Sequence, residues 1–201
     1  MRLILIITTA ILFKYSYFGQ SDEDYFKKGK EKAEQKDYTT AILNYDQAIL
    51  INSKDSSYYF FRAKSKHALK DFKGAILDYD IAITTSPKYG QAYNNRGTEK
   101  YALKNYQGAV LDYNKALELN PNDSLVYVNR GAAKNSLADY RGAIQDYNKA
   151  IELNSNNRSA YFNRAITRKT LGENDGACDD MRKALELGSA EAIEGVKMFC
   201  N

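Results

Sequence analysis

The feature that most constrains the fold of this chain is a sequence period of 34 residues. Alanine recurs at that spacing in two series, Ala41, Ala75, Ala109, Ala143 and Ala177, and Ala48, Ala82, Ala116, Ala150 and Ala184. Aromatic residues recur in register with them, at Tyr25, Tyr59, Tyr93, Tyr127 and Tyr161, and at Tyr45, Tyr79, Tyr113 and Tyr147. A fixed period of this length is typical of proteins built from stacked repeats. The repeats predicted from it are 22–55, 56–89, 90–123, 124–157 and 158–191.

Each repeat is predicted to fold into two helices separated by a short break. The break falls at Asp37, Asp71, Asn105, Asp139 and Glu173, and its Asp and Asn residues are expected to cap the second helix. Pro87 and Pro121 cannot continue a helix, so they end two of the second helices. Small residues on the first helices, Gly29, Ala63, Gly97, Gly131 and Ala165, allow close packing, and the two alanine series are their expected partners. A helix pair of this size cannot bury its apolar face alone, so stacked pairs are expected to form an α-solenoid.

The repeat pattern resembles the tetratricopeptide repeat. The likeness rests on the period, on the small residue four positions after the first aromatic residue, and on A-x3-Y-x2-A in the second helix, with Tyr in place of the usual Trp. It covers residues 22–191, and the segment 93–121 is an especially close match. The resemblance implies an all-α solenoid, a right-handed superhelix of five helix-turn-helix units, within a domain of residues 20–201. Residues 189–200 are predicted to form a capping helix, which terminal repeats need.

The resemblance also implies a partner-binding surface, because a peptide usually lies along the concave surface formed by the first helices in this family. The matching positions here are Phe60, Phe61, Lys64, His67, Asn94, Asn95, Tyr101, Asn129, Asn135, Phe162 and Asn163. An amide side chain donates and accepts hydrogen bonds, so a ladder of Asn95, Asn129 and Asn163 would hold an extended peptide backbone. Phe60, Phe61 and Phe162 would add apolar pockets. The alternative is that these asparagines bond to neighbouring helices.

Charged residues follow the same period. A basic column, Lys28, Arg62, Arg96, Arg130 and Arg164, matches a column on the second helices, Asn44, Asp78, Asp112, Asp146 and Asp180. We interpret them as Arg–Asp pairs that join the two helices of repeats two to five, with a ligand role as the alternative. A further basic column, Lys32, Lys66, Lys100, Lys134 and Arg168, is interpreted either as a solvated helix face or as a strip that favours acidic ligands.

The two ends of the chain predict export. An uncharged apolar run from Leu3 to Phe13 follows Arg2, which is the pattern of a signal peptide over residues 1–19; the alternatives are an uncleaved anchor and a buried N-terminal helix or strand. The expected location is periplasmic, cell-surface or secreted, with membrane contact only through an uncleaved segment. Cysteines tend to pair in oxidising compartments, so a Cys178–Cys200 disulfide is predicted to hold the capping helix, with two buried inert thiols as the alternative.

The sequence carries no motif for catalysis. It has no phosphate loop and no HExxH, and one histidine with two cysteines is too few for a structural zinc site. The net charge of +4 is small and the basic residues are not clustered, which argues against nucleic-acid binding. We therefore expect no enzyme activity, catalytic residue, metal, cofactor or small-molecule substrate. The predicted function is a protein- or peptide-binding module, an adaptor in a cell-envelope complex; the alternative is a structural assembly subunit that uses end-to-end or convex-face contacts.

Overall fold

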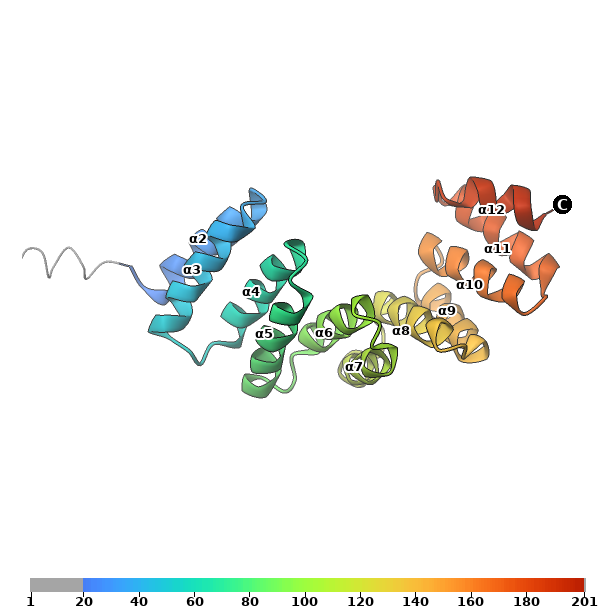
Figure 1. Cartoon of the computed structure of the whole chain (residues 1–201). Coiled ribbons are helices and arrows are strands. Elements are labelled where there is room, and N and C mark those ends of the chain that lie inside the picture. Colours follow the sequence, from blue (N-terminus) through green and yellow to red (C-terminus); the bar gives the residue numbers. More distant parts are fainter. Residues whose placement is uncertain (1–19, 201) are drawn as a thin grey trace, which may run out of the picture. The chain divides into compact units, whose positions relative to one another are not determined.

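The computed structural model describes residues 20–200, and within that range every regular element is a helix (Figure 1). The repeats are built by the pairs α2 (Asp22–Glu34) and α3 (Tyr38–Ile51), α4 (Ser56–Ala68) and α5 (Phe72–Thr85), α6 (Gly90–Ala102) and α7 (Tyr106–Leu119), α8 (Ser124–Ser136) and α9 (Tyr140–Leu153), and α10 (Arg158–Thr170) and α11 (Asn174–Glu186). A last helix, α12 (Ala192–Phe199), follows them. The predicted signal peptide or anchor lies outside the described residues.

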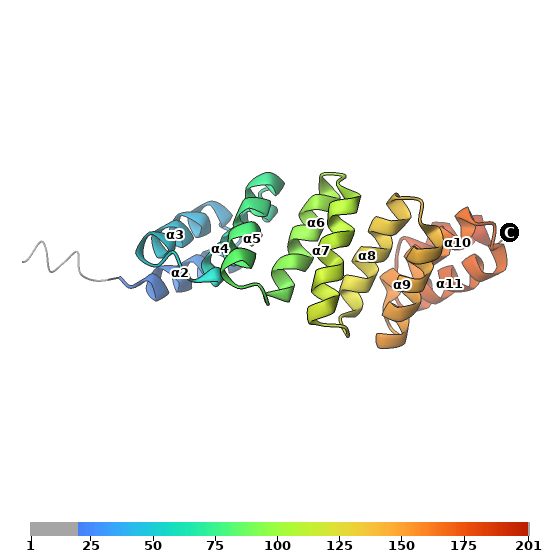
Figure 2. The same ribbon diagram turned by 90° about the horizontal axis from the view of Figure 1, so that it is seen from below.

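The chain forms two compact units, one ending at Ser86 and the other beginning at Pro87. Unit 1 contains α2 to α5, and unit 2 contains α6 to α12. Within each unit the two helices of a repeat pack together, and each second helix also contacts the first helix of the next repeat (Figure 2). First helices contact one another as well: α2 with α4 in unit 1, and α6 with α8 and α8 with α10 in unit 2. The predicted all-α architecture of helix-turn-helix repeats is confirmed.

The second helices begin at the predicted caps. The side chain of Asp37 accepts a hydrogen bond from the backbone N–H of Thr40, and Asp71, Asn105 and Asp139 cap α5, α7 and α9 in the same way. Such a bond satisfies a backbone donor that the first turn leaves unpaired. Glu173 makes no such bond, so α11 lacks a side-chain cap. The residue before each cap has a positive φ, between 62° and 78°, at Lys36, Lys70, Lys104, Ala138 and Gly172.

Close packing inside a repeat depends on a glycine that faces a tyrosine ring. A Cβ atom added to Gly29, Gly97 or Gly131 would lie 2.4, 2.7 or 2.6 Å from the Cε1 atom of Tyr45, Tyr113 or Tyr147. The nearest partners of these glycines are therefore tyrosine rings, which the expectation of alanine partners did not include. The alanines are buried too, and Ala109 and Ala116 lie in one core cluster with Tyr113. The recurring glycine, tyrosine and alanine positions therefore determine how closely the two helices of a repeat pack.

The last helix covers the end of unit 2. Ala192 is fully buried in a cluster with Ala165, Met181 and Ala184, and Val196 and Phe199 pack against it. The helix begins at Ala192 rather than at the predicted residue 189, because Gly188 adopts a positive φ and Ser189 is buried in the turn. The sulfur atoms of Cys178 and Cys200 are bonded, with Cα atoms 5.0 Å apart, so α11 is linked to the end of α12.

Candidate functional site on the first helices

The predicted site residues all lie on first helices, but they divide between the two units. Unit 1 carries the aromatic and basic members, Phe60, Phe61, Lys64 and His67, all on α4. Unit 2 carries Asn94, Asn95 and Tyr101 on α6, Asn129 and Asn135 on α8, and Phe162 and Asn163 on α10. We call the asparagines Asn94, Asn95, Asn129, Asn135 and Asn163 the amide face. Each unit thus presents a surface of its own chemistry.

The amide face is held together by hydrogen bonds between neighbouring first helices. Asn129 Nδ2 donates to Asn94 Oδ1 at 3.1 Å, which joins α8 to α6. Asn94 Nδ2 in turn donates to Asn95 Oδ1 at 3.4 Å. Thr167 Oγ1 donates to Asn135 Oδ1 at 3.0 Å, which joins α10 to α8. Asn94, Asn129 and Asn135 therefore bond to neighbouring helices, which was the alternative to a peptide-binding ladder.

Part of the amide face keeps its hydrogen-bonding capacity. Asn163 is half-buried, and its side-chain amide makes no hydrogen bond to any other residue in the described range 20–200. Asn129 uses its Nδ2 group, and its Oδ1 accepts no bond from this same part of the chain. Asn95 accepts one bond and donates none within these residues. The ladder of Asn95, Asn129 and Asn163 stays a prediction, while sequence reasoning missed that Asn94 connects two of its members.

Phe60 and Phe162, two of the predicted aromatic site residues, pack against the cores of their units. Phe60 is 4% exposed, and its ring centroid lies 5.5 Å from Phe61 and 5.8 Å from Tyr79. Its assignment to an exposed pocket is therefore corrected, because the side chain points into the core of unit 1. Phe162 is half-buried and packs against the core cluster of Met181 and Ala184. Phe61 is half-buried on the face between α2 and α4, with its ring 5.3 Å from that of Phe26.

The remaining predicted residues are near the surface. Lys64 is exposed, and its ammonium lies 5.4 Å from the centroid of the Phe61 ring. His67 is exposed near the end of α4, with its ring 5.8 Å from that of Phe72. In unit 2, Tyr101 is half-buried, and its hydroxyl lies 3.3 Å from Ser136 Oγ. These positions leave Phe61 and Lys64 as the accessible predicted residues beside the contact between α2 and α4.

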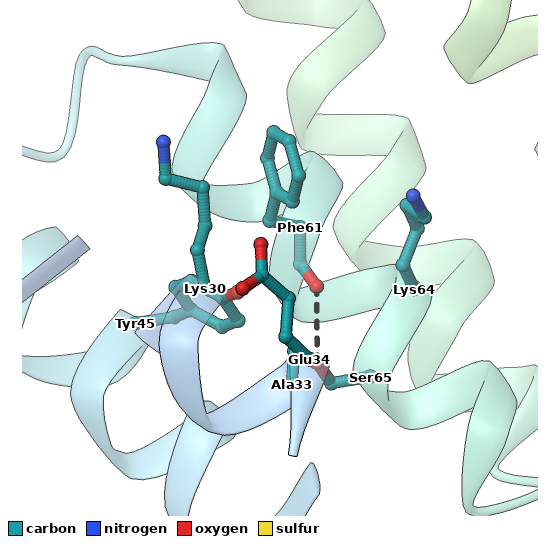
Figure 3. Close-up of a pocket in the computed structure, with 7 residues that line it drawn as sticks. All are labelled: Lys30, Ala33, Glu34, Tyr45, Phe61, Lys64 and Ser65. Atoms are coloured by element: carbon teal, nitrogen blue, oxygen red, sulfur yellow. Dashed lines mark hydrogen bonds between the residues drawn. The ribbon is translucent and has the colours of Figure 1, made fainter. Parts of the chain in front are cut away.

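A pocket of about 280 Å³ opens in unit 1 between α2 and α4 (Figure 3). Seven residues line it: Lys30, Ala33, Glu34, Tyr45, Phe61, Lys64 and Ser65. Tyr45 Oη is buried there and has no hydrogen-bond partner within the described chain. Burial, together with the negative charge of Glu34, raises the pKa of Tyr45 to about 12. The hydroxyl is therefore protonated at neutral pH and can donate a hydrogen bond.

The charged columns form a repeated structural cluster. In repeat four, Arg130 Nε and Nη2 donate to Asp146 Oδ2 and Oδ1 at 2.9 and 2.6 Å. Lys134, one turn further along α8, lies 2.9 Å from the same carboxylate. Repeats two, three and five repeat the arrangement around Asp78, Asp112 and Asp180. The predicted Arg–Asp pairs are confirmed by these contacts.

The same clusters correct both interpretations of the second basic column. Lys66, Lys100, Lys134 and Arg168 each lie within 2.9 Å of a buried aspartate, so they do not form a free basic strip or a merely solvated face. Repeat one differs, because Asn44 replaces the aspartate and donates instead to the backbone carbonyl of Thr40 at 2.8 Å. The charged residues that line the pocket in unit 1 are Lys30, Glu34 and Lys64.

The described residues contain neither a candidate membrane span nor a candidate metal site. None of the helices between residues 20 and 200 combines the length and the apolar character needed to cross a bilayer. In the same range, no group of three His, Cys, Asp or Glu side chains is arranged to hold a metal ion. A second pocket lies beside the disulfide and is lined by Asn174, Asp175, Cys178, Asp179, Arg182, Phe199 and Cys200.

Sequence profiles of known families match four segments of the chain, all in unit 2. Profiles described as tetratricopeptide repeat match residues 90–123, 112–145 and 159–188. A profile described as TPR repeat matches residues 133–172. No curated protein sequence matches the chain.

Solved structures of repeat proteins resemble most of the chain. A crystal structure of MamA is 21% identical, with a TM-score of 0.75 over 82% of this chain and 96% of that one. MamA from Desulfovibrio magneticus RS-1, from residue 41 onward, is 16% identical, with a TM-score of 0.79 over 84% and 96% of the two chains. YrrB, described as a TPR protein with an unusual peptide-binding site, is 18% identical, with a TM-score of 0.74 over 87% and 91%. At these identities the likeness establishes the fold.

Proposed function

Because this chain is a tetratricopeptide repeat protein, and its repeats make it a protein–protein interaction module, we propose that it binds an extended segment of a partner protein along its first helices. The proposed binding surface is the amide face, which lies wholly within unit 2. The proposed activity is capture without catalysis. The wider role proposed is that of an adaptor in a cell-envelope complex.

The observation that carries the proposal is the unused hydrogen-bonding capacity of the amide face. Asn163 makes no side-chain hydrogen bond within residues 20–200, and Asn129 keeps a carbonyl oxygen that accepts none there. An extended peptide presents N–H and C=O groups alternately, and an amide can pair with both. The bond from Asn129 to Asn94 fixes the orientation of one amide before a peptide arrives. Fixed groups lose less entropy on binding than mobile ones do.

Export is proposed on two features. The apolar run from Leu3 to Phe13 has the pattern of a signal peptide, and the Cys178–Cys200 bond fits an oxidising compartment. Intact mass of the protein isolated from its native host without reductant tests this location. A mass that lacks two thiol hydrogens and the leader supports export. Retention of both free thiols and of the leader contradicts it.

Affinity capture from the native envelope fraction tests the proposed binding surface. The baits are the full chain, a variant with Asn95, Asn129 and Asn163 changed to Ala, and a control with Gln47, Gln107 and Gln145 changed to Ala. The control removes three amides that are exposed on the second helices α3, α7 and α9. All baits must first show equal helicity. We expect a partner that the wild type and the control retain and the asparagine variant loses. Equal retention by all three contradicts binding on the amide face.

A structural assembly subunit is the second candidate, and a column of exposed leucines on the second helices favours it. Leu43 and Leu77 in unit 1 are 59% and 64% exposed, and Leu111 in unit 2 is 68% exposed. Leu43 and Leu77 occupy the same position on the two second helices of unit 1, and self-assembly would remove such exposed apolar side chains from water. Sedimentation of the purified chain over a concentration series tests this alternative. Self-association that a Leu43→Ser, Leu77→Ser variant abolishes supports it, and a monomer at every concentration contradicts self-assembly.

A further inference from the structure

We propose that the pocket between α2 and α4 receives one carboxamide side chain, a glutamine or asparagine, from the bound segment. This inference rests on the proposed function, because it assigns a side-chain subsite on first helices of unit 1, the kind of helix to which the partner segment is proposed to bind. The pocket lies wholly inside unit 1 and is lined by side chains of α2, α3 and α4 (Figure 3).

The first argument is the unpaired hydroxyl of Tyr45. In repeat three the equivalent Tyr113 lies 3.4 Å from Thr98 Oγ1, which accepts its hydrogen bond. In repeat one the position of Thr98 is occupied by Lys30, which has no acceptor. The ammonium of Lys30 instead lies 4.7 Å from the centroid of the Phe26 ring. A side chain of the protein therefore accepts from the hydroxyl in repeat three, whereas in repeat one no acceptor is present among the described residues.

The second argument is the burial of that hydroxyl in a pocket wall. The Tyr45 side chain is 0% exposed, and its Oη has no partner among the described residues. Buried polar groups in proteins are nearly always hydrogen-bonded, so an unpaired one calls for an explanation. Tyr45 also lines the pocket that opens between Lys30 and Lys64. An oxygen atom at the end of an inserted side chain would accept the bond.

The third argument concerns the charge of the inserted group. Glu34 lines the same pocket, and its negative charge acts on the Tyr45 hydroxyl. A carboxylate at the bottom of the pocket would therefore meet a like charge, which is unfavourable. A carboxamide avoids this repulsion, since its oxygen accepts from Tyr45 Oη while its NH₂ donates to the Glu34 carboxylate. A purely apolar side chain would leave the buried Tyr45 hydroxyl without a partner.

The remaining lining residues suit a short chain of methylene groups. Ala33 and Phe61 supply apolar walls, and Ser65 uses its hydroxyl internally, donating to the Phe61 carbonyl at 3.3 Å. Lys64 lies beside the Phe61 ring at the edge of the pocket. A volume of about 280 Å³ suffices for one side chain, and it is at the lower limit for small-molecule sites. The ammonium groups of Lys30 and Lys64 can then bond to backbone carbonyls of the segment outside the pocket.

Capped tripeptides of the form acetyl-Ala-X-Ala-amide test the proposal, with X as Gln, Glu or Leu. Their backbones are identical, so differences in affinity report the central side chain alone. Each is titrated into the isotope-labelled full chain and followed by backbone amide chemical shifts. We expect the Gln peptide to bind most tightly and to shift the amides of Ala33 and Ser65. A neutral hydrogen bond corresponds to roughly a three- to tenfold change in affinity, so we expect Tyr45→Phe to weaken the Gln peptide by about that factor.

Two further variants separate ligand recognition from structural effects. Tyr113→Phe is the matched control, because it removes the equivalent hydroxyl in unit 2, and we expect unchanged binding of the Gln peptide. Glu34→Gln removes the negative charge beside Tyr45, so we expect the preference for Gln over Glu to narrow. A change in the folding of the pocket alone would not shift that preference. Circular dichroism confirms that each variant is folded before titration.

Three outcomes overturn the proposal. Tightest binding of the Glu peptide would mean that Lys30 and Lys64 make an anion site. Equal binding of the Leu and Gln peptides would mean that the Tyr45 hydroxyl recognises nothing. Absence of shifts at Ala33 and Ser65 with every peptide would mean that the pocket takes no side chain. Each of these leaves the proposed function standing if capture still depends on Asn95, Asn129 and Asn163; loss of that dependence is the separate failure of the proposed function.

Discussion

Unit 1 and unit 2 use the same helix-turn-helix backbone but present different side chains on their first helices. In unit 1 that face has Phe61, Lys30 and Lys64 around a pocket with an unpaired tyrosine hydroxyl. In unit 2 it has asparagines that bond from helix to helix, such as Asn129 to Asn94. The alanine and tyrosine columns recur in both units, so they determine the backbone. The positions between these columns are free to vary, and they determine what each unit can bind.

Repeats one and three show this difference at one equivalent position, the buried tyrosine of the second helix. Tyr45 and Tyr113 occupy the same place, and both are buried against a glycine. Tyr113 has Thr98 as a partner, whereas Tyr45 faces the position held by Lys30. The two repeats therefore share the buried tyrosine and the backbone, and they differ in whether the tyrosine hydroxyl has a partner among the described residues. Binding capacity in such an array is best sought where a repeat departs from its neighbours.

The largest expected effect concerns the Arg–Asp–Lys clusters, which unit 2 has in each repeat and repeat one lacks. Asp146→Ala would leave the partly buried Arg130 and Lys134 without their carboxylate, so we expect a loss of about 3 kcal/mol in the free energy of unfolding. Asn44→Ala at the same column of repeat one removes a single bond to Thr40 and should cost less than about 1 kcal/mol. Urea unfolding measures both. Equal losses would mean that the clusters add no stability beyond what repeat one has.

The next largest effect concerns the glycine that faces a tyrosine ring. Both units have this glycine, so the loss of stability should be the same in both. Gly29→Ala and Gly131→Ala each place a Cβ atom within 2.6 Å of a tyrosine ring, so we expect losses of about 1–3 kcal/mol in either unit. Gly90→Ala is the control, since its Cβ would lie 3.5 Å from the nearest atom, in Leu119. Thermal melting should show a lower Tm for the first two variants and no decrease for the control. If only one of the two variants kept the wild-type Tm, the spacing between the paired helices would differ between the two units.

A smaller effect should have opposite signs in the two units. Tyr113→Phe loses the bond to Thr98 and should destabilise unit 2 by about 0.5–1.5 kcal/mol. Tyr45→Phe removes a buried hydroxyl that has no partner in the described chain, so stability should be unchanged or should rise by up to about 1 kcal/mol. Chemical denaturation of both variants checks the difference. If Tyr45→Phe is as destabilising as Tyr113→Phe, its hydroxyl has a partner that the structure does not contain.

The smallest effect concerns the turn between the helices of a repeat. Ala138 and Lys36 both have φ of 62°, while Gly172 occupies the equivalent place in repeat five. Glycine adopts this region without steric cost, so Ala138→Gly and Lys36→Gly should each stabilise the protein by about 0.5–1 kcal/mol. Gly172→Ala should destabilise it by a similar amount. Differential scanning calorimetry resolves such changes in Tm, and a decrease for Ala138→Gly would contradict this account of the turn.

Most of the fold could be predicted from the sequence because its determinants recur. The Asp and Asn caps, the helix breaks and the Arg–Asp pairs each occur several times at a fixed spacing. Lys134 could have been placed as well, since it lies four residues after Arg130 and so reaches the same aspartate. The left-handed turn residues were missed because four of the five are not glycine.

The candidate site was harder to predict, because its contacts occur once and do not recur at the 34-residue spacing. Phe60 and Phe61 are adjacent in the sequence, yet one is buried and the other is half-exposed. The pairing of Asn129 with Asn94 joins two repeats and follows no column of like residues. The pocket depends on the absence of an acceptor for Tyr45, which becomes visible only when the three helices are placed together.

The central claim is that partners bind to the first helices. Amide hydrogen exchange of the full chain, with and without the partner isolated by capture, tests it most directly. The account predicts slower exchange on α4, α6, α8 and α10 in the complex, with α5, α7, α9 and α12 unchanged. Protection confined to the second helices or to α12 would contradict it and would favour binding through the exposed leucine column or the end of the array.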